Sequence, residues 1–322
     1  MTLSRIPRRW IPIAIAAALA VIAAAAPRTA QAQRTGARFG SDYRSRIDTT
    51  FAFDKTGSIN VSAGNGDITI TGWSRDQVYV RAVSENSNLR LDASSSRVTL
   101  ELAAGSRGSD ARFEVSVPYG VHVVVRAISG DITVRGTRGE VEAHTQNGDI
   151  EVEDVTNRLD INSLSGSIEA HNVSGDIDIG TTSGDIKLVD LRGNVEVGSV
   201  SGEIDLRGVT SKLVRAKTTS GDVTFDGLVD PAGRYDLATH SGDVRLHVPR
   251  DASAQLTVET WNGGVNSEFP ITLKPGAQHA GWSGNGKRFT FALGAGAARI
   301  SATTFSGDIT ISSNGHGAAE RR

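Results

Sequence analysis

The stretch SLSGSIEAHNVSGDIDIGTTSGDIKLVDLRGNVEVG (residues 163–198) holds two copies of one 18-residue unit. Each copy begins with Ser or Thr, then any residue, then Ser-Gly, and an Ile follows two positions after the Gly. The turn glycine recurs along the chain at Gly130, Gly148, Gly166, Gly184 and Gly202, and then at wider steps at Gly221, Gly242 and Gly263. A fixed period of this size is typical of stacked structural repeats.

Short alternating segments follow each of these turns. In the unit that starts at Thr181, Ile186 and Leu188 flank the polar Lys187, and Val195 and Val197 repeat the pattern about nine residues later. Alternation with a period of two predicts strands with one buried and one solvated face. Each unit therefore reads as strand, turn, strand, turn, and no stretch after residue 32 shows a capped helical pattern.

Two strands per coil, repeated in register, predict an all-β fold, a flattened parallel β-solenoid with 18–21 residues per coil. Each coil is expected to hydrogen-bond to the next at a spacing of about 4.8 Å. Glycine suits the corner because it adopts positive φ without strain. Antiparallel hairpins closed into a barrel are the alternative, since Asn-Gly and Ser-Gly-Asp are also hairpin signals. The inward residues recur at one phase in every coil, which favours the solenoid.

The N-terminus has the pattern of a secretory signal peptide. Three arginines lie within residues 5–9, an Ala-rich apolar run spans residues 10–26, and Ala30-Gln31-Ala32 supplies a small-x-small cleavage site. We therefore expect residues 1–32 to be removed and the protein to be exported, to the periplasm, the cell surface or the medium. The apolar run is short for a spanning helix, so no transmembrane segment is expected in the mature chain.

The rest of the chain divides by regularity. Residues 33–120 alternate less strictly and are expected to form a β capping region, because the end of a solenoid must cover an exposed sheet edge. Residues 121–311 are the predicted repeat domain, and residues 312–322 are a predicted disordered tail.

The net charge bears on the kind of partner, and the cysteine content bears on covalent cross-links and anchors. Residues 33–322 hold 30 Lys and Arg against 36 Asp and Glu, a net charge of −6, which argues against nucleic acid as a partner. The chain has no Cys, so neither disulfides nor a lipidated cysteine are expected.

Several longer motifs carry a family resemblance. They are GSINVSAGNGDITITGW (residues 57–73), VPYGVHVVVRAISGDI (117–132), VPRDASAQLTVETWNGGV (248–265) and GAARISATTFSGDITI (296–311). In this order they resemble the bacterial β-strand-repeat family called "putative adhesin", a domain family of unknown function. The resemblance spans nearly the whole chain after the signal peptide and implies an exported all-β repeat protein. It implies no catalytic or ligand-binding residues.

Two columns of polar residues accompany the turn glycines. Acids directly after the glycine would stack about one strand spacing apart, and they could form a Ca²⁺ ladder or serve only the local turn backbone. The candidates for the ladder are Asp131, Asp149, Asp185, Asp222 and Asp243. The Ser or Thr three residues before the glycine, as in Thr145 and Thr260, is expected to form a hydroxyl ladder that satisfies buried corner groups.

The residue two positions before each turn glycine is predicted to point outward at the corner, and it varies from coil to coil. Trp261 and Phe305 are large for such a position, and Trp282 lies in a Gly-rich stretch nearby in sequence. One hypothesis is that the three form a contact surface for a glycan or a protein, since aromatic side chains supply such surfaces. The other is that they pack under the Gly-rich excursion of residues 270–300.

The sequence favours a non-catalytic protein without a cofactor, acting as an adhesive, structural or interaction module of the cell envelope. No Ser, His and acid cluster indicates a nucleophile. A solenoid enzyme acting on polysaccharide would need paired carboxylates and sugar-stacking aromatics, and it is the first alternative. A partner or sensor of another envelope protein is the second.

Overall fold

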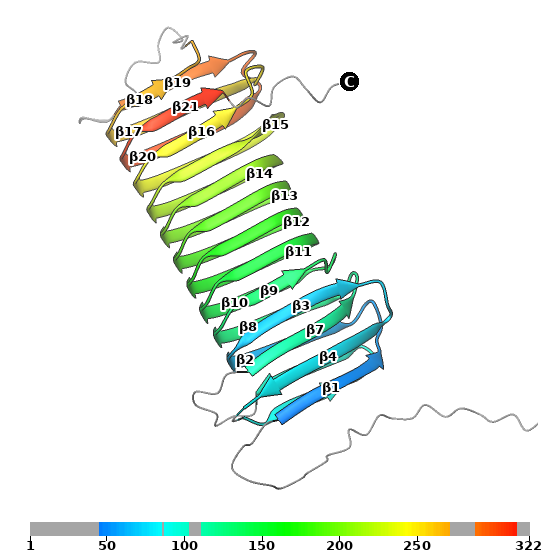
Figure 1. Cartoon of the computed structure of the whole chain (residues 1–322). Coiled ribbons are helices and arrows are strands. Elements are labelled where there is room, and N and C mark those ends of the chain that lie inside the picture. Colours follow the sequence, from blue (N-terminus) through cyan, green and yellow to red (C-terminus); the bar gives the residue numbers. More distant parts are fainter. Residues whose placement is uncertain (1–44, 86, 103–110, 271–286, 314–322) are drawn as a thin grey trace, which may run out of the picture. The chain divides into compact units, whose positions relative to one another are not determined.

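The computed structural model describes residues 45–85, 87–102, 111–270 and 287–313, and these contain 21 strands and no helix (Figure 1). The centre is a series of five long strands, each of which runs around most of one coil. They are β11 (Ile150–Ser165), β12 (Ile168–Ser183), β13 (Ile186–Ser201), β14 (Ile204–Ser220) and β15 (Val223–Ser241).

Each long strand pairs in parallel with its neighbours in the stack. Ile168 of β12 faces Ile150 of β11 on one side and Ile186 of β13 on the other, so the 18-residue sequence period is the ladder register. The flattened parallel β-solenoid is confirmed, and the hairpin alternative is wrong for these coils. The weaker second corner does not interrupt the ladder as a separate turn. It is a bend within each strand, with positive φ at Asn157, Asn172 and Gly175 in β11 and β12.

The core lies between the two faces of each coil. In β13 the inward residues Ile186, Leu188, Leu191, Val195 and Val197 are at most 2% exposed, and the alternate residues face solvent. Full burial of a side chain of this size contributes roughly 1.5–3 kcal/mol. Because the register is in phase, each inward residue contacts its equivalents in the coils on both sides.

The strong corner requires glycine for two reasons. Gly184 has a φ of +139°, a conformation that residues with a side chain rarely adopt. A Cβ on Gly184 would also lie 2.1 Å from the carbonyl oxygen of Gly166 in the neighbouring coil. The same close approach recurs at each step of a stacked column, which contains Gly66, Gly130, Gly148, Gly166, Gly184, Gly202, Gly221, Gly242, Gly307 and Gly263.

The N-terminal coils are not stacked in chain order. The first coil, β2 (Ser58–Asn65) with β3 (Asp67–Trp73), lies between two later ones. On one side it pairs with β8 (His122–Ser129) and β9 (Ile132–Arg135), which lead to β10 (Val141–Asn147) and β11. On the other side it pairs with β6 (Arg97–Leu102) and β7 (Ala111–Pro118).

Antiparallel strands close this end of the stack. The strands are β1 (Ser45–Ala52), β4 (Gln77–Ser84) and β5 (Leu89–Ala93). β4 pairs with β7, β1 pairs with β4, and β5 pairs with β6. Ile47, Phe51, Leu89 and Leu91 of β1 and β5 are partly buried against the end of the core.

The C-terminal end uses the same device. The last coil in the chain, β20 (Ala298–Ser306) with β21 (Ile309–Ser313), pairs with β15 and β16 (Val244–Val248) on one side. On its other side it pairs with β17 (Ala254–Asn262) and β18 (Val265–Ser267), while β19 (Lys287–Leu293) pairs antiparallel with β17. The expectation that each coil bonds to the next along the chain is therefore wrong at both ends.

The final strand ends later than the sequence indicates. β21 continues to Ser313, whose N–H donates to Glu268 at 3.0 Å, whereas the tail was predicted to begin at Ser312. Residues 314–322 and the predicted signal peptide lie outside the described residues.

A test of the corner compares two glycines 14 residues apart. Gly184→Ala should lower the free energy of unfolding by roughly 2–4 kcal/mol, because it adds both backbone strain and a collision with Gly166. Gly198→Ala is the control, since a Cβ there meets nothing within 4 Å, and it should change stability by less than about 1 kcal/mol. Urea unfolding of both variants measures the difference, and equal losses would contradict the stacking argument.

Engineered disulfides test the order of the C-terminal coils, since the native chain has no Cys. Thr303 faces Ala238 on one side and Glu259 on the other. The pairs Thr303→Cys with Ala238→Cys and Thr303→Cys with Glu259→Cys should both oxidise within one molecule. Ala238→Cys with Glu259→Cys should stay reduced, because two strand spacings, about 9.6 Å, are too far for a disulfide. Stacking in chain order would instead link Ala238 to Glu259.

Candidate functional site

The turn acids hold neighbouring coils together at the strong corner. Asp149 Oδ1 accepts a hydrogen bond from the backbone N–H of Ser167, the equivalent residue of the next coil, at 2.8 Å. At 2.7–2.9 Å the same bond joins Asp131 to Asp149, Asp185 to Glu203, Asp222 to Asp243, Asp243 to Asp308 and Asp308 to Gly264. The expectation that these acids bond within their own turn is thus corrected, because the stacked register places the next coil's N–H within reach.

All five candidates for a Ca²⁺ ladder use one carboxylate oxygen in this inter-coil bond. Within the described ranges, the group of ligand atoms compact enough to hold a metal ion consists of His122, Glu140 and Glu142, and none of the turn acids belongs to it. The hydrogen bonds that these acids accept from the backbone of the next coil account for the acid column.

Two positions in the column lack the bond. Ser167 and Glu203 each donate a backbone N–H to the preceding acid. Among the described residues, neither side chain accepts a hydrogen bond from the N–H of the next coil. A serine hydroxyl is shorter than the Asp carboxylate, and a glutamate carries its oxygens one methylene further out. The ladder therefore depends on the length of the Asp side chain as well as on its charge.

Asp222 has the most heavily engaged carboxylate of the column. It accepts the N–H of Asp243 at 2.8 Å and an Arg245 guanidinium hydrogen at 2.6 Å, and Arg245 also bonds to Asp243 at 3.0 Å. Burial acts to raise the pKa of Asp222, but the two hydrogen bonds outweigh it and hold that pKa below its ordinary value.

The hydroxyl column lies just inside the corner and is nearly buried. Thr239 donates to the carbonyl of Gly221 at 2.8 Å, Thr304 to that of Gly242 at 2.9 Å, and Thr260 to that of Gly307 at 3.0 Å. In the coils of Thr145 and Thr181 the hydroxyl instead donates two residues along its own turn, at 3.3 Å. Ser163 and Ser199 have no such partner among the described residues.

The variable residues of the corner form one continuous column, which we name the corner ridge. In spatial order the corner ridge consists of Ile128, Gln146, Leu164, Thr182, Val200, Thr219, His240, Phe305 and Trp261. Ile128, Leu164 and Val200 are each about half exposed, at 50–52%, and occupy every second coil. The ridge therefore presents large apolar side chains to solvent at a regular spacing.

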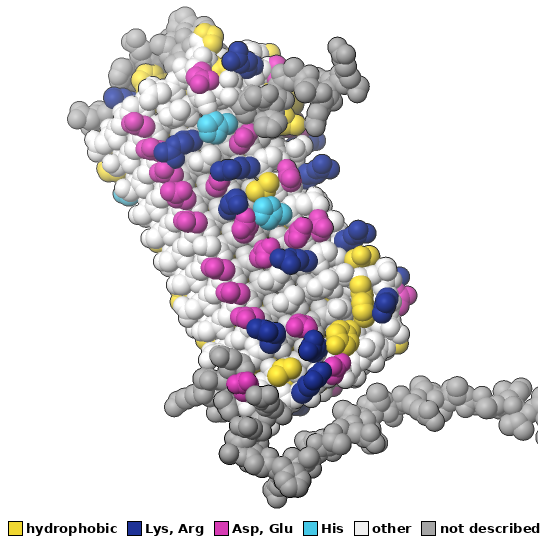
Figure 2. Space-filling model, viewed as in Figure 1, with side chains coloured by type: hydrophobic (Ala, Val, Ile, Leu, Met, Phe, Trp, Pro, Cys, Tyr) yellow, Lys and Arg dark blue, Asp and Glu magenta, His cyan; other side chains and the backbone are white. Residues whose placement is uncertain are grey.

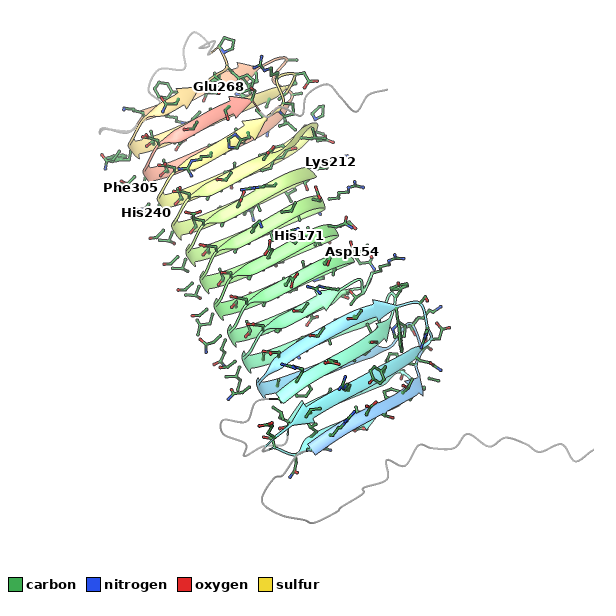
Figure 3. All side chains as sticks on the ribbon, in the orientation of Figure 1. Asp154, His171, Lys212, His240, Glu268 and Phe305 are labelled. Carbon is green, nitrogen blue, oxygen red and sulfur yellow. The ribbon has the colours of Figure 1, made fainter. Side chains whose placement is uncertain are left out.

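One end of the corner ridge is an aromatic stack. The ring of Phe305 lies 4.8 Å from that of His240 at an interplanar angle of 11°, and 6.0 Å from that of Trp261 at 12°. Figure 3 shows His240 and Phe305 side by side on the corner edge, pointing away from the core. Phe305 is 44% exposed. The stack exists because β20 inserts between β15 and β17, which places Phe305 between two rings that precede it in the chain.

The structure thus brings Trp261 and Phe305 together, as the contact-surface hypothesis requires. It adds His240, which the sequence places in the column but does not place next to Phe305. Trp282, the third predicted member, lies outside the described residues.

The flat faces carry paired charges (Figure 2). Lys187 and Glu169 are 2.6 Å apart, and Arg135 and Glu151 are 2.9 Å apart, each across neighbouring coils. These side chains are about half exposed, and ion pairs of this kind contribute little to stability.

One open hollow of about 710 Å³ lies near the N-terminal corner. Its walls include Asp67, Glu85 and Glu114, together with Arg81 and Arg112, and none of the described residues that line it is aromatic. Arg81 and Glu114 are 3.5 Å apart within it. The described lining of the hollow is therefore polar and charged for the most part.

The in-register strands, the stacked glycine corner and the inter-coil acid ladder define a parallel β-solenoid of the β-strand-repeat class. The chain belongs to the Toastrack DUF4097 family, whose sequence profile matches residues 56–312. The family resemblance seen in the sequence motifs is confirmed.

Several solved structures resemble this chain with low sequence identity and low TM-scores. A "putative cell adhesion protein" from Clostridium sporogenes has 10% identity over 84% of this chain and 100% of its own, with a TM-score of 0.21. A "putative adhesin" from Bacteroides fragilis has 10% identity, coverage of 84% and 97%, and a TM-score of 0.33. A "putative lipid binding protein" from Parabacteroides distasonis has 9% identity, coverage of 84% and 97%, and a TM-score of 0.28. Similarity at this level does not identify a function.

No curated protein matches the sequence. In the part of the chain that the structure describes, no helix is long and apolar enough to cross a membrane.

Asp222 provides a test of the acid ladder by pH. Its lowered pKa means that its contribution to stability is present above the unfolded carboxyl value, near pH 4, and is lost as the pH falls through the lower folded value. Asp222→Asn should therefore destabilise the protein by about 1–2 kcal/mol at pH 7, and the gap to wild type should narrow below about pH 4. Urea unfolding across this range measures the gap, and a gap that stays constant down to pH 3 would contradict the ladder's electrostatic role.

Proposed function

We propose that this protein is an exported, non-catalytic binding module of the bacterial cell envelope, which holds an envelope protein along its corner ridge. The observation that carries this proposal is the aromatic stack of His240, Phe305 and Trp261, in which Phe305 is 44% exposed, at the end of a column that also exposes Ile128, Leu164 and Val200. Regular backbone positions at the corner maintain the fold, while the ridge residues vary from coil to coil. A surface that varies on a constant scaffold is suited to recognition.

The orientation of the rings favours a protein partner over a glycan. Sugar recognition by stacking needs an open aromatic face. Here both faces of Phe305 are turned toward neighbouring rings, at interplanar angles of 11° and 12°, so its edge points to solvent. Edges of stacked rings and half-exposed aliphatic side chains fit an apolar groove on a protein surface, where aromatic side chains act as binding anchors.

The engagement of the carboxylates supports a non-catalytic role over the enzyme alternative. Asp149 and Asp222 accept backbone hydrogen bonds that hold coils together. Glu151 and Glu169 are paired with Arg135 and Lys187 on the flat faces. Glycoside hydrolysis needs two carboxyl groups free to act on either side of one bond.

Export rests on the pattern of residues 1–32, and the periplasm, the cell surface and the medium are all compatible with it. The excess of acidic residues after Ala32 supports a partner other than nucleic acid.

The test compares a ridge variant with a matched variant of the flat face. Wild-type protein, the double variant Phe305→Ala with Trp261→Ala, and the control Thr133→Ala with Thr224→Ala are used to capture partners from envelope extract. Capture should fall about tenfold or more in the ridge variant, since anchors of this kind each contribute at least about 2 kcal/mol. The control should capture as wild type does, and protease rather than glycosidase treatment of the extract should abolish capture.

Stability measured on the same samples separates binding from packing. If capture survives in the ridge variant while its unfolding temperature falls, the aromatic residues serve the fold and the proposal is wrong. If glycosidase treatment alone abolishes capture, the ligand is a glycan and the argument from ring orientation is overturned.

A further inference from the structure

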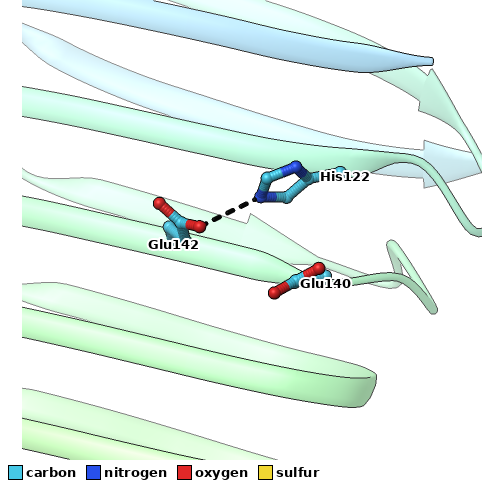
Figure 4. Close-up of side chains that lie close together, drawn as sticks. All are labelled: His122, Glu140 and Glu142. Atoms are coloured by element: carbon cyan, nitrogen blue, oxygen red, sulfur yellow. Dashed lines mark hydrogen bonds and ion pairs between the residues drawn. The ribbon is translucent and has the colours of Figure 1, made fainter.

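A compact group of nitrogen and oxygen ligands is formed by side chains of β8 and of the segment that begins β10. His122 is on β8, Glu142 is on β10, and Glu140 directly precedes β10 (Figure 4). One ligand atom from each lies within 4.8 Å of the other two, and His122 Nε2 is 3.3 Å from Glu142 Oε1. The three side chains are 30–40% exposed, so an ion can reach them from solvent.

We propose that His122, Glu140 and Glu142 form a binding site for Zn²⁺ that joins β8 to β10. One imidazole and two carboxylates are a donor set that Zn²⁺ accepts, whereas Ca²⁺ and Mg²⁺ prefer sets made of oxygen alone. Two ligands on a tetrahedral zinc ion are about 3.4 Å apart, close to the observed spacing of His122 and Glu142. A small rotation of the partly exposed Glu140 side chain completes the set, and water takes the fourth position.

The charges around the site favour a cation. Glu142 begins a row of four acids in register across consecutive coils, followed by Asp160, Asp178 and Glu196. Burial is the main cause that raises the pKa of Asp178, and the neighbouring carboxylates of Asp160 and Glu196 add to it, while Arg158 acts against it.

Arg158 is the basic side chain that reaches the site. It lies 3.7 Å from Glu140 and 3.3 Å from Asp160. When Glu140 turns toward the ion, it leaves Arg158. Arg158 still pairs with Asp160, its closer partner, so its guanidinium keeps an ion pair.

A second histidine and glutamate on the same solenoid provide an internal comparison. His171 lies 3.0 Å from Glu169, but Lys187 occupies the third position at 2.6 Å from Glu169. There the positive charge is already supplied by a side chain. In the His122 group the third residue is the acid Glu140 in place of a lysine. A bound cation there would supply the positive charge that Lys187 supplies beside Glu169.

The position of the site gives the ion a structural role. β8 belongs to the coil that contacts the first coil of the chain through β2, and β10 leads into the regular coils through β11. An ion held by both strands would fix this junction, because it binds the folded state and not the separated strands.

The experiment measures Zn²⁺ binding to tag-free protein by calorimetry. Wild type should bind one ion at this site, and His122→Ala and Glu142→Gln should each weaken the Kd by at least about tenfold, since loss of even an outer-shell partner of a metal ligand has an effect of that size. His171→Ala is the matched control and should bind as wild type does. Ca²⁺ and Mg²⁺ in excess should not displace Zn²⁺.

Thermal unfolding supplies the second readout. Zn²⁺ should raise the unfolding temperature of wild type and of His171→Ala, and should leave that of His122→Ala unchanged. The proposal is overturned if wild type shows no saturable binding, or if His122→Ala and Glu142→Gln bind as tightly as wild type. It is also overturned if His171→Ala weakens binding as much as His122→Ala does.

Discussion

The close approach of backbone at the glycine corner is the constraint on which the rest of the structure depends. A Cβ on Gly184 would lie 2.1 Å from the carbonyl of Gly166, so coils can stack at strand spacing only where the corner has no side chain. Once the glycines stack, the N–H of each following residue lies beside the acid of the preceding coil. The stacked glycines set the register of the coils, and this register aligns the residues of the Asp ladder, the hydroxyl column and the corner ridge.

The ends of the solenoid show how the sheet edges are covered. A stack of parallel coils leaves unpaired backbone groups at each end, which invite pairing with other chains. At both ends the chain passes beyond a coil, adds antiparallel strands, and returns to place another coil inside the stack. At the C-terminus this return places Phe305 between His240 and Trp261. The candidate binding surface is thus a consequence of how the edge is closed.

Positions that repeat from coil to coil and positions that vary have different roles in this molecule. Positions that repeat, such as Gly184, Asp149 and Thr239, are occupied by hydrogen bonds or close contacts between coils. Positions that vary, such as those of the corner ridge and of His122, face solvent and differ chemically from one coil to the next. A repeat protein can therefore change its surface at one coil without disturbing the ladder, because each coil contacts only its neighbours.

The sequence by itself determined the parallel solenoid, its 18-residue register and its inward residues, because period-2 alternation and a recurring glycine are local signals. It also marked Trp261 and Phe305 as unusual. It did not show that the acids bond between coils, that His240 joins the aromatic stack, or that His122 meets Glu140 and Glu142. Those contacts join residues about 18 to 65 positions apart, and only the spatial order of the coils, which departs from chain order at both ends, decides which residues become neighbours.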